Sequence, residues 1–511
     1  MYNKGYMQNY KCLKKMNFIN KFYVMGFFAT DAKIDTTERP FLCKWKKHCV
    51  CNCHIYVHPK QTYFINGRRI LIGHAYNPFT MEADENRILE SLTEESLNQL
   101  TGIFTILEIT DKGIKIVGDA TCMQCTFYGV INGHFYVSTH ANLIGDLLGL
   151  EWDPYIKQLT EYKFFKLFGT QLPGNLSEYK EIKRLVPNHI VTIENGEIKE
   201  KRFYWPHTCN LSKDEIVNKA SNLLHNNLQL IAKKWTKPAI SLTGGCDSKT
   251  TLACANGLYD KFSYFSYISS DEEKVDAEAA HSICKKLGLK HEIYDIPRDD
   301  SCFENIEDVR KVINYNCGNM RPSNANDVRK RAWFADKDLF DIEVKSWVSE
   351  IGRAYYSKRF NGRTDFGDKP TPRKCSTLYK VFAHNRSLLR RTDKAFAEYL
   401  DIYFESADEN ALPWQEQFFW EFRVAAWNAL VITHEHRYSF DITIPYNNRI
   451  LLEYLLSAPL EDRINDTIYK DIRSKMNPEI DNTNISVQNV KHTSTRAEFE
   501  NAYYVLNRII P

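Results

Sequence analysis

The residues with the clearest chemical potential lie together, where a short apolar run gives way to a helix-forming segment. They are Ser241, Thr243, Gly244, Gly245, Asp247 and Ser248. Paired glycines allow a sharp turn and let the backbone come close to a ligand. The first amide groups of a following helix have no intrahelical partners, so they can bind an anion with the helix dipole behind them. The pattern predicts an anion site at a strand–turn–helix junction.

The carboxylate in this segment restricts the kind of anion. Asp247 would repel a phosphate unless a cation such as Mg²⁺ lay between them, whereas Ser248 can add a hydroxyl donor. We therefore predict a site for a metal-chelated polyphosphate, with Asp247 as the metal ligand. Lys249 has no glycine before it, so the segment is not a Walker A loop. The alternative is a glycine turn before an ordinary helix.

The run Thr243-Gly244-Gly245-Cys246-Asp247-Ser248 resembles the Ser/Thr-Gly-Gly-x-Asp-Ser signature of the PP-loop ATP pyrophosphatases. Members of that superfamily split ATP between its α- and β-phosphates and adenylate a substrate. The resemblance implies ATP and Mg²⁺ as cofactors.

The flanking pattern predicts the elements that hold this loop. Residues 213–234 have helical spacing, 262–268 fits a buried strand, 273–287 is helical, and 290–296 fits a third strand. Strands alternating with helices imply a parallel sheet, whose ligands bind beyond the carboxyl ends of the strands. In the superfamily the second strand lines the adenine, which makes Tyr267 and Ile268 the adenosine candidates. An ordinary core strand is the alternative.

The chain before about residue 205 has a different pattern, dominated by short strands. These strands are expected at 63–65, 69–72, 103–107, 114–117 and 134–137, with a helical stretch at 85–100. Asn132-Gly133 and Asn195-Gly196 are typical hairpin turns between such runs. We expect antiparallel sheets with helices attached.

Segments of this first part resemble, in order, the glutaminase domain of asparagine synthetases. The segments are 102–106, 118–120, 127–129, 136–138, 181–190 and 202–205. The resemblance implies a degenerate glutamine amidotransferase-like α+β domain of the Ntn type at 1–205. It implies an α/β PP-loop synthetase domain with a parallel sheet and a helical C-terminal part at 206–511.

The nucleophile of such a glutaminase is missing. Those enzymes use an N-terminal cysteine, but residue 2 is Tyr, and Met25 stands at the counterpart of the cysteine in the opening strand expected at 22–28. Met has no nucleophilic thiolate, so we expect no glutamine hydrolysis. A processed precursor that exposes Cys43 or another internal cysteine is the alternative. A retained domain without its nucleophile resembles the β-lactam synthetases and lasso-peptide cyclases.

The segment 349–355 resembles the Asp-Glu-Leu-Phe-Gly-Gly-Tyr motif of the family. Ser349 replaces a metal-binding aspartate, and Ser346 replaces an upstream glutamate. Glu350 is retained, and the resemblance implies a role as a carboxylate near the metal or as the base that deprotonates the amine. A salt bridge between Glu350 and Arg353 is the alternative.

The last third of the chain is largely helical by pattern, including an aromatic-rich stretch at 414–430. The segments 444–451 and 469–473 resemble family motifs in the same order. Lys491, within 487–492, matches a lysine that contacts the α-phosphate or pyrophosphate in the family. A solvent-facing lysine is the alternative.

A cysteine- and histidine-rich stretch needs a separate explanation. It contains Cys43, His48, Cys49, Cys51, Cys53 and His54. Alternate residues of one strand share a face, so Cys49, Cys51 and Cys53 could align. The spacing fits the usual zinc pattern poorly, since no second pair is evident. Metal binding and a merely cysteine-rich strand both remain open.

The composition limits the classes of protein to which this chain could belong. The chain has 511 residues, 43% hydrophobic residues and a net charge of +3, so we expect two to four domains and no nucleic-acid or membrane partner. No apolar run reaches the roughly 18 residues that span a bilayer. The 14 cysteines, without secretory features, predict reduced thiols in the cytoplasm.

Taken together, the residues and the resemblance predict an AMP- and pyrophosphate-forming amide ligase that joins a carboxylate substrate to an amine. Intramolecular ring closure of the β-lactam or lasso-peptide type stays open, as does a degenerate nucleotide-binding partner subunit. Homodimer formation is also left open.

Overall fold

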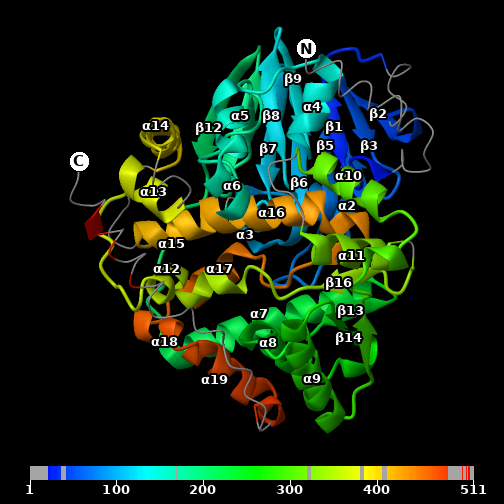
Figure 1. Ribbon diagram of the computed structural model, residues 1–511, viewed down its shortest axis with the longest axis vertical. Coiled ribbons are helices and arrows are strands. Elements are labelled where there is room, and N and C mark those ends of the chain that lie inside the picture. The colour runs from blue at the N-terminus through cyan, green and yellow to red at the C-terminus, as the bar shows by residue number, and fades with distance from the viewer. Residues whose placement is uncertain are drawn as a thin grey trace.

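The computed structural model describes residues 21–35, 42–168, 171–318, 324–335, 337–379, 385–404 and 411–481, together with 498, 502, 505 and 506. Figure 1 shows two antiparallel sheets above a long central helix, with a parallel sheet and further helices below it.

The first antiparallel sheet has the strand order β10-β8-β9-β1-β3-β2. Its strands are β1 (Phe27–Thr30), β2 (Lys46–Val50), β3 (Cys53–Val57), β8 (Phe127–Ile131), β9 (His134–Ser138) and β10 (Ile182–Arg184). The second has the order β12-β11-β7-β6-β5-β4. Its strands are β4 (Tyr63–Asn66), β5 (Arg69–Tyr76), β6 (Thr101–Ile109), β7 (Gly113–Gly118), β11 (His189–Glu194) and β12 (Glu197–Arg202). Side chains of both sheets, such as Phe27, Ile70 and Ile116, share one buried core.

The local patterns of this part are mostly confirmed. Asn132-Gly133 and Asn195-Gly196 turn two hairpins with positive φ, as left-handed turns require. The helix expected at 85–100 is instead two short helices, α2 (Glu85–Glu90) and α3 (Glu94–Gln99). Thr93 interrupts it, because its extended backbone and capping box with Ser96 start a new helix.

The strand expected at 22–28 is shorter than predicted. Tyr23 and Met25 both have φ of 53°, which strand geometry does not allow, so β1 begins only at Phe27. Gly26 N–H donates to Tyr23 O at 2.9 Å and closes this turn. Met25 therefore lies in a turn before the strand.

The parallel sheet has the order β15-β14-β13-β16-β17. Its strands are β13 (Pro238–Ser241), β14 (Ser263–Ile268), β15 (His291–Asp295), β16 (Ile342–Val344) and β17 (Ile442–Thr443). The helices α7 (Lys213–Lys234), α8 (Cys246–Cys254) and α9 (Asp271–Lys286) belong to this half. The predicted alternation of strands and helices and the parallel pairing are confirmed.

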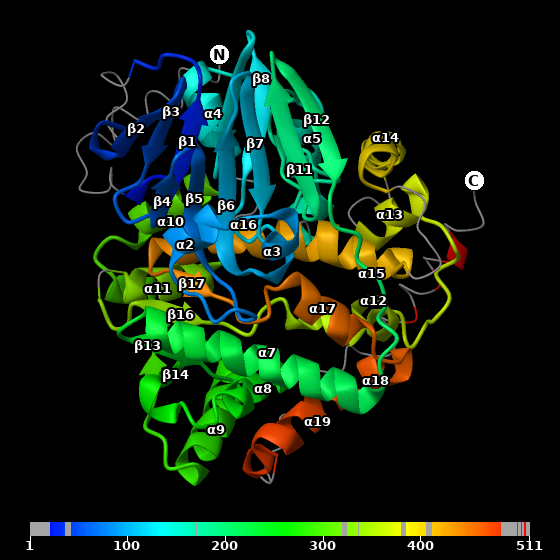
Figure 2. The same cartoon turned by 180° about the vertical axis from the view of Figure 1, so that it is seen from behind.

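The aromatic-rich stretch forms a continuous helical segment across the middle of the molecule. It comprises α15 (Trp414–Phe418), a π-helical turn (Phe419–Val424) and α16 (Ala425–His434). Figures 1 and 2 show it between the antiparallel sheets and the parallel half. Other α-helices among the described residues are α4 (Ala141–Leu148), α5 (Pro154–Glu161), α6 (Lys163–Phe168), α10 (Ile306–Asn316), α11 (Ala325–Phe334), α12 (Tyr355–Arg359), α13 (Pro372–Tyr379), α14 (Arg386–Tyr403), α17 (Arg449–Leu456), α18 (Leu460–Ile464) and α19 (Thr467–Met476).

Buried polar side chains join the antiparallel sheets to the later part of the chain. We call this group the seam network; it consists of Asp119, Asn188, Arg202, Glu421, Asn447, Asn448 and Arg449. Arg202 pairs with both Glu421 oxygens at 2.6 and 2.8 Å, and Asn447 donates to Asp119 at 2.8 Å.

Within the described ranges, no helix has the length and hydropathy needed to cross a membrane.

Candidate functional site

The glycine loop lies at the carboxyl end of the central strand of the parallel sheet. β13 ends at Ser241, and α8 begins at Cys246 with Gly245 in the N-cap position. β14 and β16 flank β13 on either side. The predicted strand–turn–helix junction is confirmed, and its helix amides point out of the edge where parallel sheets bind ligands.

Hydrogen bonds within the loop fix its shape. The Ser248 hydroxyl donates to Thr243 O at 2.9 Å and accepts from Thr243 N–H at 3.2 Å. Gly245 N–H donates to Thr243 Oγ1 at 3.1 Å, and Gly244 N–H donates to the Asp276 carboxylate of α9. Ser248 therefore holds the turn rather than presenting a free donor to a ligand.

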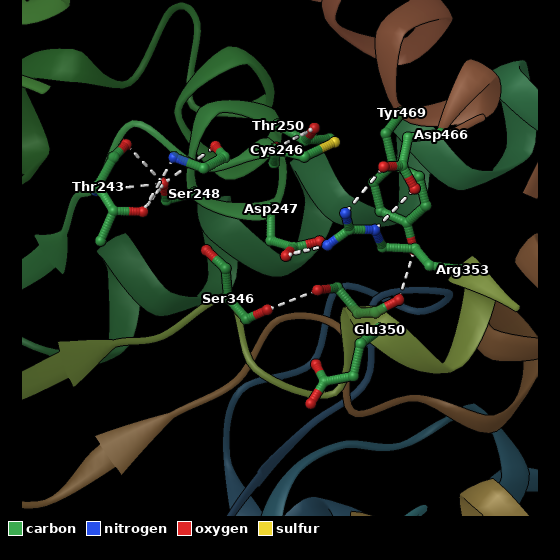
Figure 3. A network of polar contacts seen from close by, with 12 residues as sticks. Thr243, Cys246, Asp247, Ser248, Thr250, Ser346, Glu350, Arg353, Asp466 and Tyr469 are labelled. Carbon is green, nitrogen blue, oxygen red and sulfur yellow. Dashed lines mark hydrogen bonds and ion pairs between the residues drawn. The ribbon is translucent and has the colours of Figure 1, made fainter. Parts of the chain in front are cut away.

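A chain of charged side chains surrounds Asp247; we call Asp247, Arg353, Lys358 and Asp466 the loop network. Arg353 Nη1 donates to Asp247 Oδ2 at 2.6 Å. The same guanidinium binds both oxygens of Asp466 at 2.8 Å, and Lys358 Nζ lies 2.5 Å from Asp466 Oδ1. Figure 3 shows Asp247 between the loop residues and Arg353. These side chains keep 13–29% of their surface exposed.

Two carboxyl groups here have perturbed acidity. Burial raises the pKa of Asp247, and the nearby positive charge of Arg353 only partly opposes this. Burial, reinforced by the negative charge of Asp247, also raises the pKa of Glu350. Both shifts strengthen these groups as proton acceptors at neutral pH.

Glu350 is not salt-bridged in the way the alternative suggested. Arg353 turns to Asp247 and Asp466, whereas Glu350 Oε1 accepts from Asn428 Nδ2 at 3.3 Å. Glu350 lies in a short 3₁₀ turn (Ser349–Arg353) between β16 and α12. Its carboxylate is thus held by a neutral amide close to the loop.

Asp247 is the carboxylate of this site that could coordinate a magnesium ion. Asp247 Oδ1 is buried and takes no part in the ion pair with Arg353; the Ser349 hydroxyl is the polar group beside the carboxylate, so a cation can still be coordinated there. Ser349, which the sequence comparison set against a metal-binding aspartate, donates its hydroxyl to Ser346 O at 2.7 Å. Ser346 Oγ is in turn bonded to Thr251 Oγ1 at 2.7 Å. Mg²⁺ often takes one or two carboxylates and completes its shell with water and phosphate.

The other predicted site residues are only partly brought together. Ser241 ends β13 beside the loop, half-buried. Tyr267 and Ile268 end the neighbouring strand β14, and Lys330 lies 5.0 Å from the Tyr267 ring. Ile268 O accepts from Ile296 N–H at 2.8 Å, so this carbonyl takes part in the pairing at the end of the sheet. Lys491 lies outside the described residues.

Sequence reasoning missed the cationic side of the site. Arg473 of α19 lies 3.1 Å from Thr250 Oγ1 and 3.2 Å from Cys246 Sγ, at the start of α8. Arg473 belongs to the segment 469–473, which resembles a family motif, but its spacing did not predict a contact with α8. Arg353 could be considered from the sequence because it follows Glu350 by three residues. Asp466 lies 113 residues beyond Arg353, and no motif or spacing predicted that the two side chains would meet.

The cysteine-rich stretch does not share one strand face. Cys49 lies in β2, Cys51 has φ of 52° in the turn, and Cys53 begins β3, so a hairpin separates the three thiols. Cys53 is buried, whereas Cys49 and Cys51 are exposed. Among the described residues, the three thiols do not converge on one metal-sized space.

Met25, which the sequence comparison set against the nucleophile of a glutaminase, lies in the turn before β1. It lines a cavity of about 520 Å³ with Lys60, Phe440 and Asp441. A thioether offers no thiolate for attack on an amide.

No protein-family model and no curated protein matches the sequence. Solved structures match in part. An allosteric regulatory enzyme of purine biosynthesis is 11% identical with a TM-score of 0.22, over 48% of this chain and 60% of that one. Glutamine phosphoribosylpyrophosphate amidotransferase from B. subtilis, complexed with ADP and GMP, is 10% identical with a TM-score of 0.21, over 66% and 72%. Glutamine-dependent NAD⁺ synthetase from Acinetobacter baumannii, in complex with ADP, is 12% identical with a TM-score of 0.20, over 46% and 53%. Similarity this low carries no argument about activity.

Proposed function

We propose that this chain is an ATP-dependent amide ligase that forms AMP and pyrophosphate. The observation that carries the proposal is the glycine loop at the end of the central parallel strand, beside Asp247, whose buried Oδ1 is not paired with Arg353. The Thr-Gly-Gly-Cys-Asp-Ser sequence of the loop supports the same nucleotide class. Mg²⁺ held by Asp247 would offset the charge of the phosphates.

The proposed reaction has two steps. A substrate carboxylate oxygen attacks the α-phosphorus of ATP, and pyrophosphate leaves to give an acyl-adenylate. An amine then attacks the acyl carbon, AMP leaves with the bonding electron pair, and Glu350 accepts the proton of the amine. The raised pKa of Glu350 suits this role, since a base works best when its pKa approaches the working pH. The α8 amides and Lys491 are the proposed contacts to the departing pyrophosphate.

The amine source follows from Met25. Without a nucleophile in the first part, the amine is free ammonia, a small amine or an amine within the substrate itself. The last case is the cyclase alternative. We retain the division into 1–205 and 206–511, with the cytoplasm as the place of action, as parts of this proposal.

A second function is favoured by one specific contact. Arg353 lies 2.6 Å from Asp247 Oδ2 and already neutralises the predicted metal ligand. A guanidinium in this place lets the loop bind a nucleotide without a metal ion, as in a catalytically inactive nucleotide-binding subunit. Ser349, in the place of the second metal ligand, supports the same alternative.

Carboxylate-dependent ATP–pyrophosphate exchange separates the two functions. The ligase should exchange label only with Mg²⁺ and a carboxylate, and Asp247→Asn should lower the rate at least about 100-fold, the cost of one key electrostatic contact. Asp260→Asn, an exposed change in the same half, is the matched control and should leave exchange unchanged. ATP binding in EDTA without exchange under any carboxylate would instead establish the binding-only function.

A further inference from the structure

A second cluster of metal-binding side chains lies away from the glycine loop, on the segment that joins the antiparallel sheets to α7. Ligand atoms of His207, Cys209 and Glu453 all lie within 4.8 Å of one another. His207 and Cys209 come from the segment after β12, and Glu453 comes from α17. In Figure 2 this segment runs beside α17 on its way to α7.

The backbone explains why these side chains converge. His207 forms a single antiparallel bridge with Ala411, so the chain is extended there, and residues two apart point to the same side. His207 N–H donates to Glu453 Oε1 at 3.0 Å, and Cys209 N–H donates to Ser457 Oγ at 2.7 Å. Two main-chain hydrogen bonds therefore fix both side chains over the last turns of α17.

The charges and burial at this place favour a bound cation. The Glu453 side chain is only 5% exposed, and its carboxylate accepts hydrogen bonds from His207 N–H and from the Tyr204 hydroxyl. The Nδ1 atom of the His207 ring lies 3.0 Å from Glu453 Oε1. A buried carboxylate normally needs a cation or several donors. The Cys209 thiol is half-buried in the same space and can become a second negative ligand.

The ligand types restrict the ion. Magnesium and calcium prefer oxygen ligands, and a soft copper(I) ion prefers sulfur. One imidazole nitrogen, one thiolate and one carboxylate are the ligands that zinc combines in proteins. Three protein ligands leave one tetrahedral position, and the His207 side chain is 49% exposed, so water can reach that position.

We propose that His207, Cys209 and Glu453 form a zinc site that fastens the connecting segment to α17, with water as the fourth ligand. This site is independent of the proposed ligase activity, because it lies outside the loop network and uses none of its residues.

Cobalt(II) is the probe, because a cobalt–thiolate bond absorbs light where the free ion does not. The full chain, stripped with a chelator and dialysed, should develop thiolate-to-cobalt absorption that saturates at about one ion per chain and is abolished by Zn²⁺. Cys209→Ser should remove this absorption. The double change Cys49→Ser and Cys51→Ser, at two exposed thiols, is the control and should retain it.

Glu453→Gln tests the carboxylate separately and should weaken zinc binding at least about tenfold, as measured by competition with a chromophoric chelator. Because Glu453 is buried, the circular dichroism spectrum of this variant is compared with that of the wild type. The proposal is overturned if the wild-type chain shows no thiolate-to-cobalt absorption. It is equally overturned if the absorption persists in the Cys209→Ser variant, or if it is lost in the variant that carries Cys49→Ser and Cys51→Ser.

Discussion

The seam network and the loop network each contain an ion pair between an arginine and a carboxylate, but the two pairs differ in burial and in how many of their polar atoms are paired. In the seam network, the Arg202 and Glu421 side chains are 3% and 2% exposed, and Glu421 also accepts from Asn188 at 2.9 Å. In the loop network, the Arg353 and Asp247 side chains are 19% and 27% exposed, and one Asp247 oxygen takes no part in the ion pair.

This difference separates a structural role from a binding role. Burial would raise the pKa of Glu421, but the charge of Arg202 outweighs it and the pKa lies below its usual value. At Asp247 burial wins, and the pKa is raised. A completed buried pair resists change, whereas an incomplete and accessible one can still gain a ligand.

The largest effect is expected in the seam network. Glu421→Ala leaves the Arg202 guanidinium buried without its ion-pair partner and should lower the free energy of unfolding by about 3–5 kcal/mol. Urea denaturation followed by circular dichroism measures this loss. The exposed pair Arg68–Asp111 supplies the control, and Asp111→Asn should leave the unfolding curve unchanged. A small loss at Glu421 would show that the two networks do not differ in this way.

Glu178 is an exception that sharpens the comparison. It is buried near Gly318, its Oε2 has no partner among the described residues, and burial raises its pKa to about 8. The folded state thus holds this proton more tightly than the unfolded state, whose pKa is about 4.3. Wild-type stability should therefore fall by up to about 1.4 kcal/mol per pH unit as the pH rises from about 5 to 8.

Glu178→Gln removes this titration. The variant should gain stability relative to the wild type as the pH rises, by about 3 kcal/mol at pH 7 compared with pH 4. Thermal or urea unfolding across this pH range measures the difference. Glu181→Gln, an exposed change three residues away, should run parallel to the wild type. A stability difference that does not vary with pH would mean that Glu178 is ionised in the folded chain.

The smallest effect on stability is expected in the loop network. Arg353→Ala removes contacts to Asp247 and Asp466 that are partly exposed to water, so it should cost only about 1–2 kcal/mol of unfolding free energy. Urea denaturation under the conditions used for Glu421→Ala makes the comparison direct. Lys358→Ala, which removes one contact to Asp466, should cost less than Arg353→Ala. A loss at Arg353 equal to that at Glu421 would make the loop network structural as well.

Local features of the fold could be predicted because their causes are local in sequence. The helix predicted at 213–234 has those bounds, since Ser212 and Glu215 form a capping box at its start. The glycine loop was predicted from six neighbouring residues. The predicted bounds were wrong where a local capping interaction ended or restarted a helix, as the N-cap at Thr93 does within the stretch 85–100.

The sequence by itself determined the loop, its strand and its helix, and it placed Asp247 where a cation could bind. Only the tertiary structure decided that Arg353 reaches Asp247 across 106 residues and that His207 meets Glu453 across 246. Side-chain pairing at such separations depends on how whole elements pack. Backbone propensity and motif spacing act over a few residues, so they carry no information about which charge a loop will meet.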